Sequence, residues 1–391
     1  MDFLLHVYRR FRRAIWIAVR KALKWLLLLV PVKKNKIVLI NFNGKGFGCN
    51  PKYIALEILR QGLPYDLVWL VSDMNEPFPE GIRKVRCYSY REIYELATAK
   101  VIITNVKNDI GIHKRRSQYL IHTWHGSYCA KLVEREAESR LSAQYVKESK
   151  HHSKISDLFL SNSRALTQSY RDSFWYDGEV MECGFPRNDV LFADRDRQAR
   201  TVRAALGIEQ EGKLALYAPT FRDDGSTDCY GIDCRGVLNT LGRGWYLIIR
   251  LHPNAGSAEK LFAFGDGVVD GTAYPDMQEL LAASDILITD YSSTIFEFAA
   301  MGKPSFIFAS DVEAYQQMRG LRPDFFTMPY PICRTNEALL EQLRALTPES
   351  GRDLARRFSE AFGGTDQGDA SKQVTERIKA VICGTFGRKN R

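Results

Sequence analysis

Two histidines stand near the ends of apolar runs, where an imidazole could act on a bound substrate. His125 lies in a Trp-His-Gly tripeptide soon after the run that ends at Ile121, and His252 follows a run that ends at Leu251. An imidazole with a pKa near ~6.5 can take a proton from a hydroxyl at neutral pH. We therefore predict that His125 is a general base, whereas His122, which lies within its run, is as readily a core histidine.

A second group of polar residues could bind an anion. Arg222 follows the run Leu214–Ala218, Arg250 precedes His252 by two positions, and Ser292 and Ser293 begin a helix. An arginine can bind a diphosphate through two parallel hydrogen bonds, and the N–H groups of a helix start attract phosphate. Each feature has an ordinary alternative, since Arg222 could pair with a neighbouring aspartate and a serine could simply cap its helix. Because all of them follow strands of one predicted sheet, together they predict an anion pocket.

The elements that must position these residues form two successive series of strands and helices. Residues 285–308 read as a buried strand, a helix and a second strand, with Gly302 and Pro304 as stop signals. Such alternation indicates doubly wound parallel sheets, which bind ligands at the carboxyl ends of their strands. We predict two Rossmann-like α/β domains facing each other across a cleft. Predicted strands cover 36–42, 67–71, 101–104, 119–123 and 158–161, then 214–218, 246–251, 286–289 and 305–308.

A glycine-rich stretch follows the first predicted strand. Gly44, Gly46 and Gly48 alternate with other residues, but they lack the spacing of the dinucleotide-binding fingerprint. Backbone could approach a ligand closely here, yet a structural turn is the reading we favour.

The charge of the chain is concentrated at its N-terminus. The 391 residues carry a net charge of +9, and residues 1–36 hold ten basic groups against one acid, so the remainder is neutral. A neutral body without a basic and aromatic patch argues against nucleic-acid binding. The length suits two domains of ordinary size. We place an anchor segment at 1–35, a first Rossmann-like domain at 36–190, a second at 191–350 and a helical tail at 351–391.

The anchor segment predicts a basic amphipathic helix. Its apolar residues share one face of a helical wheel and its arginines and lysines lie opposite, which is typical of an interfacial membrane anchor. The longest apolar run, residues 25–32, is far too short to span a bilayer. An ordinary surface helix packed on the body is the alternative. The predicted membrane-binding residues are Arg9, Arg10, Arg12, Arg13, Trp16, Arg20, Lys21, Lys24 and Trp25.

The cysteines are typical of a reducing compartment. Eight of them are scattered along the chain without a CxxC pair. No Asp-x-Asp pair follows a predicted strand, so we expect neither a metal nor another cofactor. Together with the anchor, these features predict a peripheral protein on the cytoplasmic face of a membrane.

Several of these motifs occur together in one known family. Trp124-His125-Gly126, Ala218-Pro-Thr-Phe-Arg222, Arg250-x-His252-Pro253 and Thr289-Asp-Tyr-Ser-Ser293 resemble, in that order, the signature of the CDP-glycerol glycerophosphotransferases. The resemblance covers roughly residues 37 to 345 and implies a GT-B-like fold. It also implies transfer of a polyol phosphate, glycerol phosphate first, from a CDP-linked donor to a lipid-linked saccharide or polyol-phosphate acceptor, with release of CMP. Such enzymes serve teichoic acid or capsule synthesis at the bacterial cell membrane.

The resemblance implies a role for each motif. His125 and His252 would be catalytic, with His125 as the base on the acceptor hydroxyl. The family usually continues after Trp-His-Gly with Ser or Thr and then Pro-Leu-Lys, whereas this chain has Ser127-Tyr-Cys-Ala-Lys131. The donor side would include Thr220, Arg222, Arg250, Asp290, Ser292, Ser293 and Glu297, and the acceptor side Gly126, Ser127, Lys131 and Arg187.

Two other functions fit parts of the pattern. A GT-B glycosyltransferase that uses a nucleotide sugar would share the fold and the nucleotide pocket, so donor assays must separate it. A membrane-associated binding protein that had lost catalysis would be expected to lose the histidines, yet His125 and His252 both stand in their motifs. The sequence leaves open glycerol against ribitol, one added unit against many, and the oligomeric state.

Overall fold

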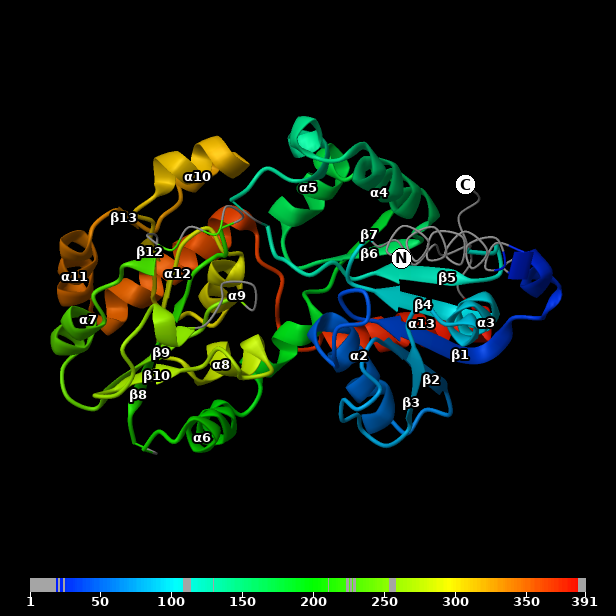
Figure 1. The fold of residues 1–391 in the computed structure, drawn as a ribbon, viewed down its shortest axis with the longest axis horizontal. Coiled ribbons are helices and arrows are strands. Elements are labelled where there is room, and N and C mark those ends of the chain that lie inside the picture. Colours follow the sequence, from blue (N-terminus) through cyan, green and yellow to red (C-terminus); the bar gives the residue numbers. More distant parts are fainter. Residues whose placement is uncertain are drawn as a thin grey trace, which may run out of the picture.

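The protein folds into two lobes, which are called the first and second domains below. Each is built on a parallel β-sheet covered by helices (Figure 1). The computed structural model describes residues 19, 22–23, 25–107, 114–128, 130–209, 211–222, 225, 227, 230–252 and 258–385. The two sheets occur in succession along the chain, which confirms the predicted α/β architecture. No helix in these ranges is both long and apolar enough to cross a bilayer.

The first sheet has seven strands in the order β3-β2-β1-β4-β5-β6-β7. Its central strands are apolar runs that are buried on both faces, as a parallel sheet covered by helices requires. The edge strands β3 and β7 carry charged residues and were not predicted. The strands are β1 (Lys33–Ile40), β2 (Asp66–Val71), β3 (Ile82–Arg86), β4 (Ala99–Thr104), β5 (Tyr119–His122), β6 (Leu158–Ser161) and β7 (Glu179–Glu182).

The second sheet has six strands in the order β10-β9-β8-β11-β12-β13. The predicted strand 246–251 ends earlier in the structure, at Ile249, so Arg250 and His252 lie in the loop beyond it. The edge strands β10 and β13 were again missed, because two or three residues carry too short a pattern to recognise. The strands are β8 (Lys213–Ala218), β9 (Trp245–Ile249), β10 (Val268–Asp270), β11 (Ile286–Thr289), β12 (Ser305–Phe308) and β13 (Ile332–Cys333).

Helices cover both sheets and connect their strands. Those of the first lobe are η1 (Leu27–Leu29), α2 (Cys49–Arg60), α3 (Tyr90–Thr98), η2 (Glu134–Arg140), α4 (Ala143–Ile155) and α5 (Arg164–Ser173), and η3 (Pro186–Phe192) joins the lobes. The second lobe has α6 (Arg195–Leu206), α7 (Cys234–Leu241), η5 (Ala258–Lys260), α8 (Met277–Ala283), α9 (Thr294–Ala300), α10 (Val312–Arg319), η6 (Pro323–Phe326) and α11 (Asn336–Ala345).

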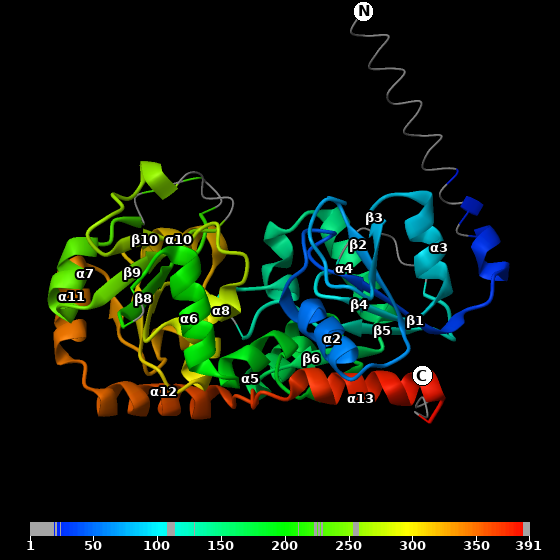
Figure 2. The same ribbon diagram turned by 90° about the horizontal axis from the view of Figure 1, so that it is seen from below.

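The C-terminal chain crosses between the lobes. Helix α12 (Pro348–Phe362) packs on α9 of the second lobe, and α13 (Ala370–Cys383) packs on α2 of the first (Figure 2). Val374 and Ile378 of α13 are fully buried in a core that also holds Ile54 and Ile58 of α2. The last helix is therefore part of the first lobe. The predicted boundaries at 35, 190 and 350 stay predictions.

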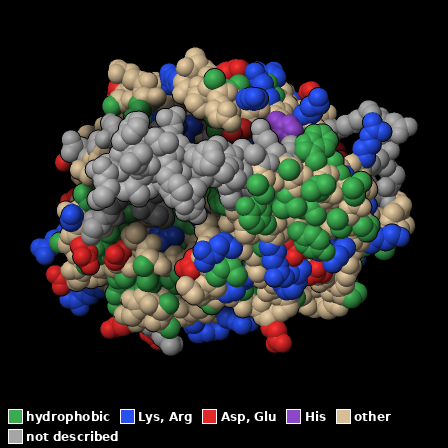
Figure 3. Space-filling view, turned by 45° about the vertical axis from the view of Figure 1, so that its right-hand side comes forward, with side chains coloured by type: hydrophobic (Ala, Val, Ile, Leu, Met, Phe, Trp, Pro, Cys, Tyr) green, Lys and Arg blue, Asp and Glu red, His purple; other side chains and the backbone are tan. Residues whose placement is uncertain are grey.

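Apolar side chains are exposed where the described chain begins. Trp25 is 71% exposed and Leu29 85% exposed, and Tyr90 at the start of α3 is 49% exposed. Figure 3 shows hydrophobic side chains gathered on this side of the molecule, with lysines and arginines beside them. Trp25 is the one predicted membrane-binding residue within the described ranges. The other eight, Arg9, Arg10, Arg12, Arg13, Trp16, Arg20, Lys21 and Lys24, lie outside them.

Candidate active site

His125 lies at the carboxyl edge of the first sheet, where the chain leaves β5. Its Nδ1 is 2.7 Å from the backbone carbonyl of Asn105, the residue that follows β4. Phe42, which follows β1, meets the imidazole edge-on at 5.3 Å, and the Trp124 ring lies 4.3 Å away. The loops that follow three neighbouring strands, β1, β4 and β5, thus surround one imidazole.

The bond to Asn105 decides which nitrogen of His125 carries the proton. A carbonyl oxygen can only accept a hydrogen bond, so Nδ1 must donate and Nε2 keeps its lone pair. Burial, followed by the nearby Arg187 guanidinium, lowers the pKa of His125 from 6.5 to about 4, although the bond to Asn105 acts in the opposite direction. The imidazole is therefore neutral at pH 7, with Nε2 able to receive a proton.

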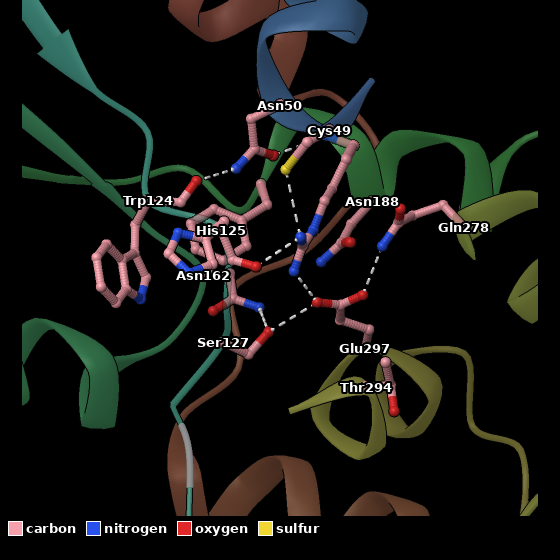
Figure 4. Close-up of polar contacts among 12 residues, drawn as sticks. Cys49, Asn50, Trp124, His125, Ser127, Asn162, Asn188, Gln278, Thr294 and Glu297 are labelled. Carbon is pink, nitrogen blue, oxygen red and sulfur yellow. Dashed lines mark hydrogen bonds and ion pairs between the residues drawn. The ribbon is translucent and has the colours of Figure 1, made fainter. Parts of the chain in front are cut away.

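Side chains from other elements fix the backbone of this loop (Figure 4). Asn50 of α2 donates from Nδ2 to the carbonyls of Thr123 and Trp124, at 3.3 and 3.0 Å. Arg187 of η3 donates from Nη1 to the carbonyl of His125 at 2.7 Å. The Trp-His-Gly segment is consequently held from the interdomain side.

Arg187 and Glu297 form a buried ion pair between the two domains. Glu297 of α9 also accepts hydrogen bonds from Ser127 Oγ at 3.3 Å and from Gln278 Nε2 of α8 at 2.7 Å. Asn162 of the first domain completes the network by donating to Ser127 Oγ at 2.8 Å. Glu297 was expected on the donor side among the phosphate contacts. The structure instead turns its carboxylate toward Arg187, which leaves neither charge open to a ligand.

Arg222 also differs from its expected placement. It is 1% exposed, and its guanidinium pairs with Asp290 at 2.9 Å and with Asp311 at 2.7 Å. The stacked rings of Tyr291 and Tyr315 lie 5.0 and 4.9 Å from it. With these partners, Arg222 and Asp290 fasten the loops after β8 and β11 to each other rather than reaching into the cleft.

The Asp290 carboxylate also holds the backbone of Thr220 in place. The backbone N–H of Thr220 donates to both oxygens of Asp290, at 2.8 and 3.0 Å, and the N–H of Tyr291 donates to it at 2.6 Å. The hydroxyl of Thr220 is buried without a hydrogen-bond partner among the described residues. Asp290 therefore shapes this edge of the sheet through the backbone.

Ser292 and Ser293 stand where the two domains touch. Ser292 Oγ accepts from the Thr294 hydroxyl at 3.0 Å, whereas Ser293 makes no capping bond to its helix. A methyl group in place of the Gly126 hydrogen would sit 3.4 Å from Ser293 Oγ. The loop that carries His125 therefore lies directly against the start of α9.

His252 lies in the loop after β9 of the second domain and is exposed. Its ring stacks on Phe221 at 5.7 Å, and its pKa is lowered by partial burial and then by Lys131, Lys45 and Arg250. Lysines from the first domain thus act on a histidine of the second. Arg250 itself donates to the carbonyls of Gly271 and Thr272, so it braces the neighbouring loop.

The loop after Gly126 is tied to the second domain, in part through Tyr128, which departs from the family pattern. The Tyr128 hydroxyl donates to Asp324 and accepts from Arg322 Nη1 at 3.1 Å. Lys131 pairs with Leu321 in an antiparallel bridge. Tyr128 and Lys131 therefore make contacts between the two domains.

Sequence reasoning missed Asn105, Asn162 and Tyr128. Asn105 directly follows the predicted strand 101–104, so the argument that singled out His125 would have found it too. Asn162 donates to Ser127 of its own domain and to Asp366 between α12 and α13, whereas Tyr128 binds Asp324 of the second domain. No spacing in the sequence predicts these partners. Among the described residues, no cluster of three or more His, Cys, Asp or Glu side chains is arranged to hold a metal ion.

Comparison with known proteins identifies the family and the fold. Residues 22–380 match the family described as CDP-Glycerol:Poly(glycerophosphate) glycerophosphotransferase. A teichoic acid poly(glycerol phosphate) polymerase of Bacillus spizizenii is 29% identical over 368 residues, or 90% of this chain and 93% of that protein. The polymerase of the same description from Bacillus subtilis is 29% identical over 92% of this chain, which spans 50% of its length. A solved structure of the wall teichoic acid polymerase TagF matches with a TM-score of 0.84 and 25% identity, covering 99% of this chain and 100% of that one.

Proposed function

The chain belongs to the CDP-glycerol:poly(glycerophosphate) glycerophosphotransferase family, and on that premise we propose that it transfers glycerol phosphate from CDP-glycerol to an acceptor hydroxyl in teichoic acid synthesis. CMP is the leaving product. Glycerol is favoured over ribitol because the relatives described above act in poly(glycerol phosphate) synthesis.

One observation carries the proposal: the His125 loop and the start of α9 meet across the cleft. A methyl group on Gly126 would lie in ordinary van der Waals contact with Ser293 Oγ, and Ser127 is bonded to Glu297 three residues beyond Thr294. A base from one domain and a helix start from the other therefore converge on one place. Transfer between two bound substrates needs such convergence, since most of the catalysis in phosphoryl transfer comes from positioning and electrostatic stabilisation.

The chemistry follows from the state of each group. The acceptor oxygen attacks the phosphorus that bears glycerol, the bond from that phosphorus to the CMP oxygen breaks, and the hydroxyl proton passes to His125 Nε2. The new bond is a phosphodiester, and CMP leaves with the charge of the broken bond. His252 and the cations near it, Lys45 and Lys131, would stabilise that charge. Ser292 and Ser293 would contact the donor phosphates.

The decisive experiment offers the purified protein a panel of donors with a lipid-linked polyol-phosphate acceptor. CDP-glycerol is expected to give CMP and an acceptor that is one or more glycerol phosphate units heavier by mass spectrometry. CDP-ribitol and a UDP-sugar are the matched alternatives. Transfer of a sugar from the UDP donor without transfer from CDP-glycerol would replace this proposal with a glycosyltransferase.

We also propose peripheral binding to an anionic membrane. Exposed Trp25 and Leu29 lie beside the exposed Lys33 and Lys34, and the sequence before them is the predicted amphipathic helix. Anionic vesicles should therefore sediment the protein less well as salt is raised, because attraction of lysine and arginine to anionic lipid is screened. Deletion of residues 1–31 should abolish sedimentation, and unchanged sedimentation after that deletion would exclude the anchor.

A further inference from the structure

Asn105 links the imidazole of His125 to the loop after β1. Its side chain is fully buried, with 0% exposed. Oδ1 accepts from the backbone N–H of Phe42 at 2.9 Å, and Nδ2 donates to Asn41 Oδ1 at 2.8 Å. The backbone carbonyl of the same residue accepts from His125 Nδ1. The position of that carbonyl therefore depends on two bonds made by the side chain of its own residue.

Asn41 extends the linkage into the glycine-rich stretch. Its Nδ2 donates to the carbonyl of Lys45 at 2.6 Å and more weakly to that of Gly46 at 3.3 Å. Its backbone carbonyl accepts from the N–H groups of Gly44 and Lys45, at 2.8 and 2.9 Å. The turn that the sequence suggested at Gly44 is thus closed from both sides by one asparagine.

The backbone of this turn tolerates little change. Phe42, Asn43 and Gly44 have φ values of 39°, 58° and 94°, in the left-handed region. A methyl group on Gly44 would lie 2.5 Å from Cys87 Sγ, so the turn is packed as well as bonded. Left-handed residues persist when the surroundings fix them, and here the fixed turn delivers the Phe42 N–H to Asn105 and the Phe42 ring to His125.

A neutral imidazole in a buried site has two tautomers, and only one leaves a lone pair on the nitrogen that must act. No carboxylate is bonded to the ring of His125 among the described residues, so the Asn105 carbonyl is the group that distinguishes Nδ1 from Nε2. Without it, a proton on Nε2 would leave no base on the side that faces the substrate.

We propose that Asn105 and Asn41 are positioning residues that set the tautomer and orientation of His125. Asn105 holds the carbonyl that receives the Nδ1 proton, and Asn41 holds Asn105 and the turn that carries Phe42. The proposal rests on the function proposed above only in assigning the base to His125. The tautomer itself can be observed whether or not that assignment is right.

The test combines NMR of the full chain, labelled with ¹⁵N-histidine, with transfer kinetics. The signals of His125 are identified by their loss in His125→Gln. The wild-type spectrum is expected to show a protonated Nδ1 and an unprotonated Nε2. In Asn105→Ala the two nitrogens should average toward a mixture, and kcat should fall about 100-fold, because a misplacement of about 1 Å can cost that much. The KM for CDP-glycerol should stay unchanged.

Two further variants keep the proposal falsifiable if Asn105→Ala does not fold. Asn41→Asp retains the acceptor for Asn105 and loses the donor to the turn, so it should disturb the tautomer less than the loss of both. Asn41→Ala loses both and should disturb it. Asn336→Ala is the matched control. The side-chain amide of Asn336 also accepts one hydrogen bond and donates one, from the Asp233 N–H and to the Gly231 carbonyl, but in the second domain, so its loss should change neither signal nor rate.

Each outcome separates the positioning role from the catalytic role. A wild-type His125 protonated on Nε2, or an Asn105→Ala enzyme with wild-type signals and kcat, would overturn the positioning proposal. If neither alanine variant folds, the wild-type spectrum still decides, because a proton on Nε2 would contradict the bond from Nδ1 to the Asn105 carbonyl. Normal transfer by His125→Gln would instead overturn its assignment as the base and leave the tautomer result standing.

Discussion

The carboxyl edges of the two sheets are held together in different ways. Around His125, neutral amides and carbonyls come from Asn41, Asn50, Asn105 and Asn162, and the charge of Arg187, which binds the His125 carbonyl, is balanced by Glu297. In the second domain, the corresponding loops are fastened by Arg222 between Asp290 and Asp311, while His252 stands near cations. A proton acceptor benefits from a neutral shell that keeps it uncharged, whereas an anion site needs positive charge at the surface and can bury its own ion pairs behind it.

The strongest test of this contrast removes the base. His125→Ala is expected to lower the single-turnover rate by about 10²–10⁴-fold, because general-base help is typically worth that much. Donor affinity should remain close to wild type, since a base acts on the acceptor hydroxyl. Rapid-quench kinetics and calorimetric titration with CDP-glycerol measure the two separately. A near-normal rate would show that His125 is not the general base.

Removing the buried cation of the other edge should act on stability first. Arg222→Ala leaves the buried Asp290 and the half-buried Asp311 without their cation. Breaking a buried pair of this kind costs about 3–5 kcal/mol of unfolding free energy. Urea unfolding measures this. Arg334→Ala is the control, because its exposed pair with Glu313 should matter by no more than about 1 kcal/mol. A stable Arg222→Ala protein that no longer binds CMP would restore Arg222 as a direct phosphate ligand.

Replacing His252 should weaken donor binding. If it contacts the donor phosphates, His252→Ala removes one hydrogen bond to a charged group, worth about 1.5–3 kcal/mol, and so weakens donor binding about 10- to 100-fold. Turnover should fall as well, because the contact exists in both ground and transition states. Calorimetric titration with CDP-glycerol distinguishes His252→Ala from His125→Ala. Equal losses of donor affinity in the two variants would contradict the assignment of His252 to the donor phosphates and His125 to the acceptor hydroxyl.

The last test lowers the pH and acts on three buried histidines of the first domain together. The pKa of His125 is lowered to about 4 and that of His152 to about 3, both chiefly by burial, and that of His122 also lies well below 6.5. Because the unfolded chain binds these protons first, stability should fall as the pH drops below ~6.5, by up to about 1.4 kcal/mol per pH unit for each histidine. The loss ends near each folded pKa.

This loss should fall on the first domain, because the second contains only the exposed His252. Hydrogen exchange at pH 7 and pH 5.5 can compare the two sheets. His152→Leu should reduce the pH dependence of the first sheet, and equal loss of protection in both would contradict the contrast.

The sequence predicted best those features that depend on a single strand, namely the strand itself and the residues at its carboxyl end. Apolar runs buried on both faces, such as Ile37–Ile40, predicted the central strands, and polar residues just after them predicted which side chains lie at the edge. Charged or very short strands at the rims, such as Ile82–Arg86, lack that signal because half of their surface meets solvent. Partners could not be predicted, since Arg187 and Glu297 are 110 positions apart and only the folded domains bring them together.

The return of α13 to the first domain has a consequence for synthesis on the ribosome. Residues 36–190 emerge early, yet the helix that buries Ile54 and Ile58 is made from residues 370–383. At translation rates of about 5–20 residues per second, the first sheet waits on the order of 10 s or more with one apolar flank open. The domain that is translated first is therefore completed last, so a chain that stops at residue 363 should release a first domain that proteases cut readily.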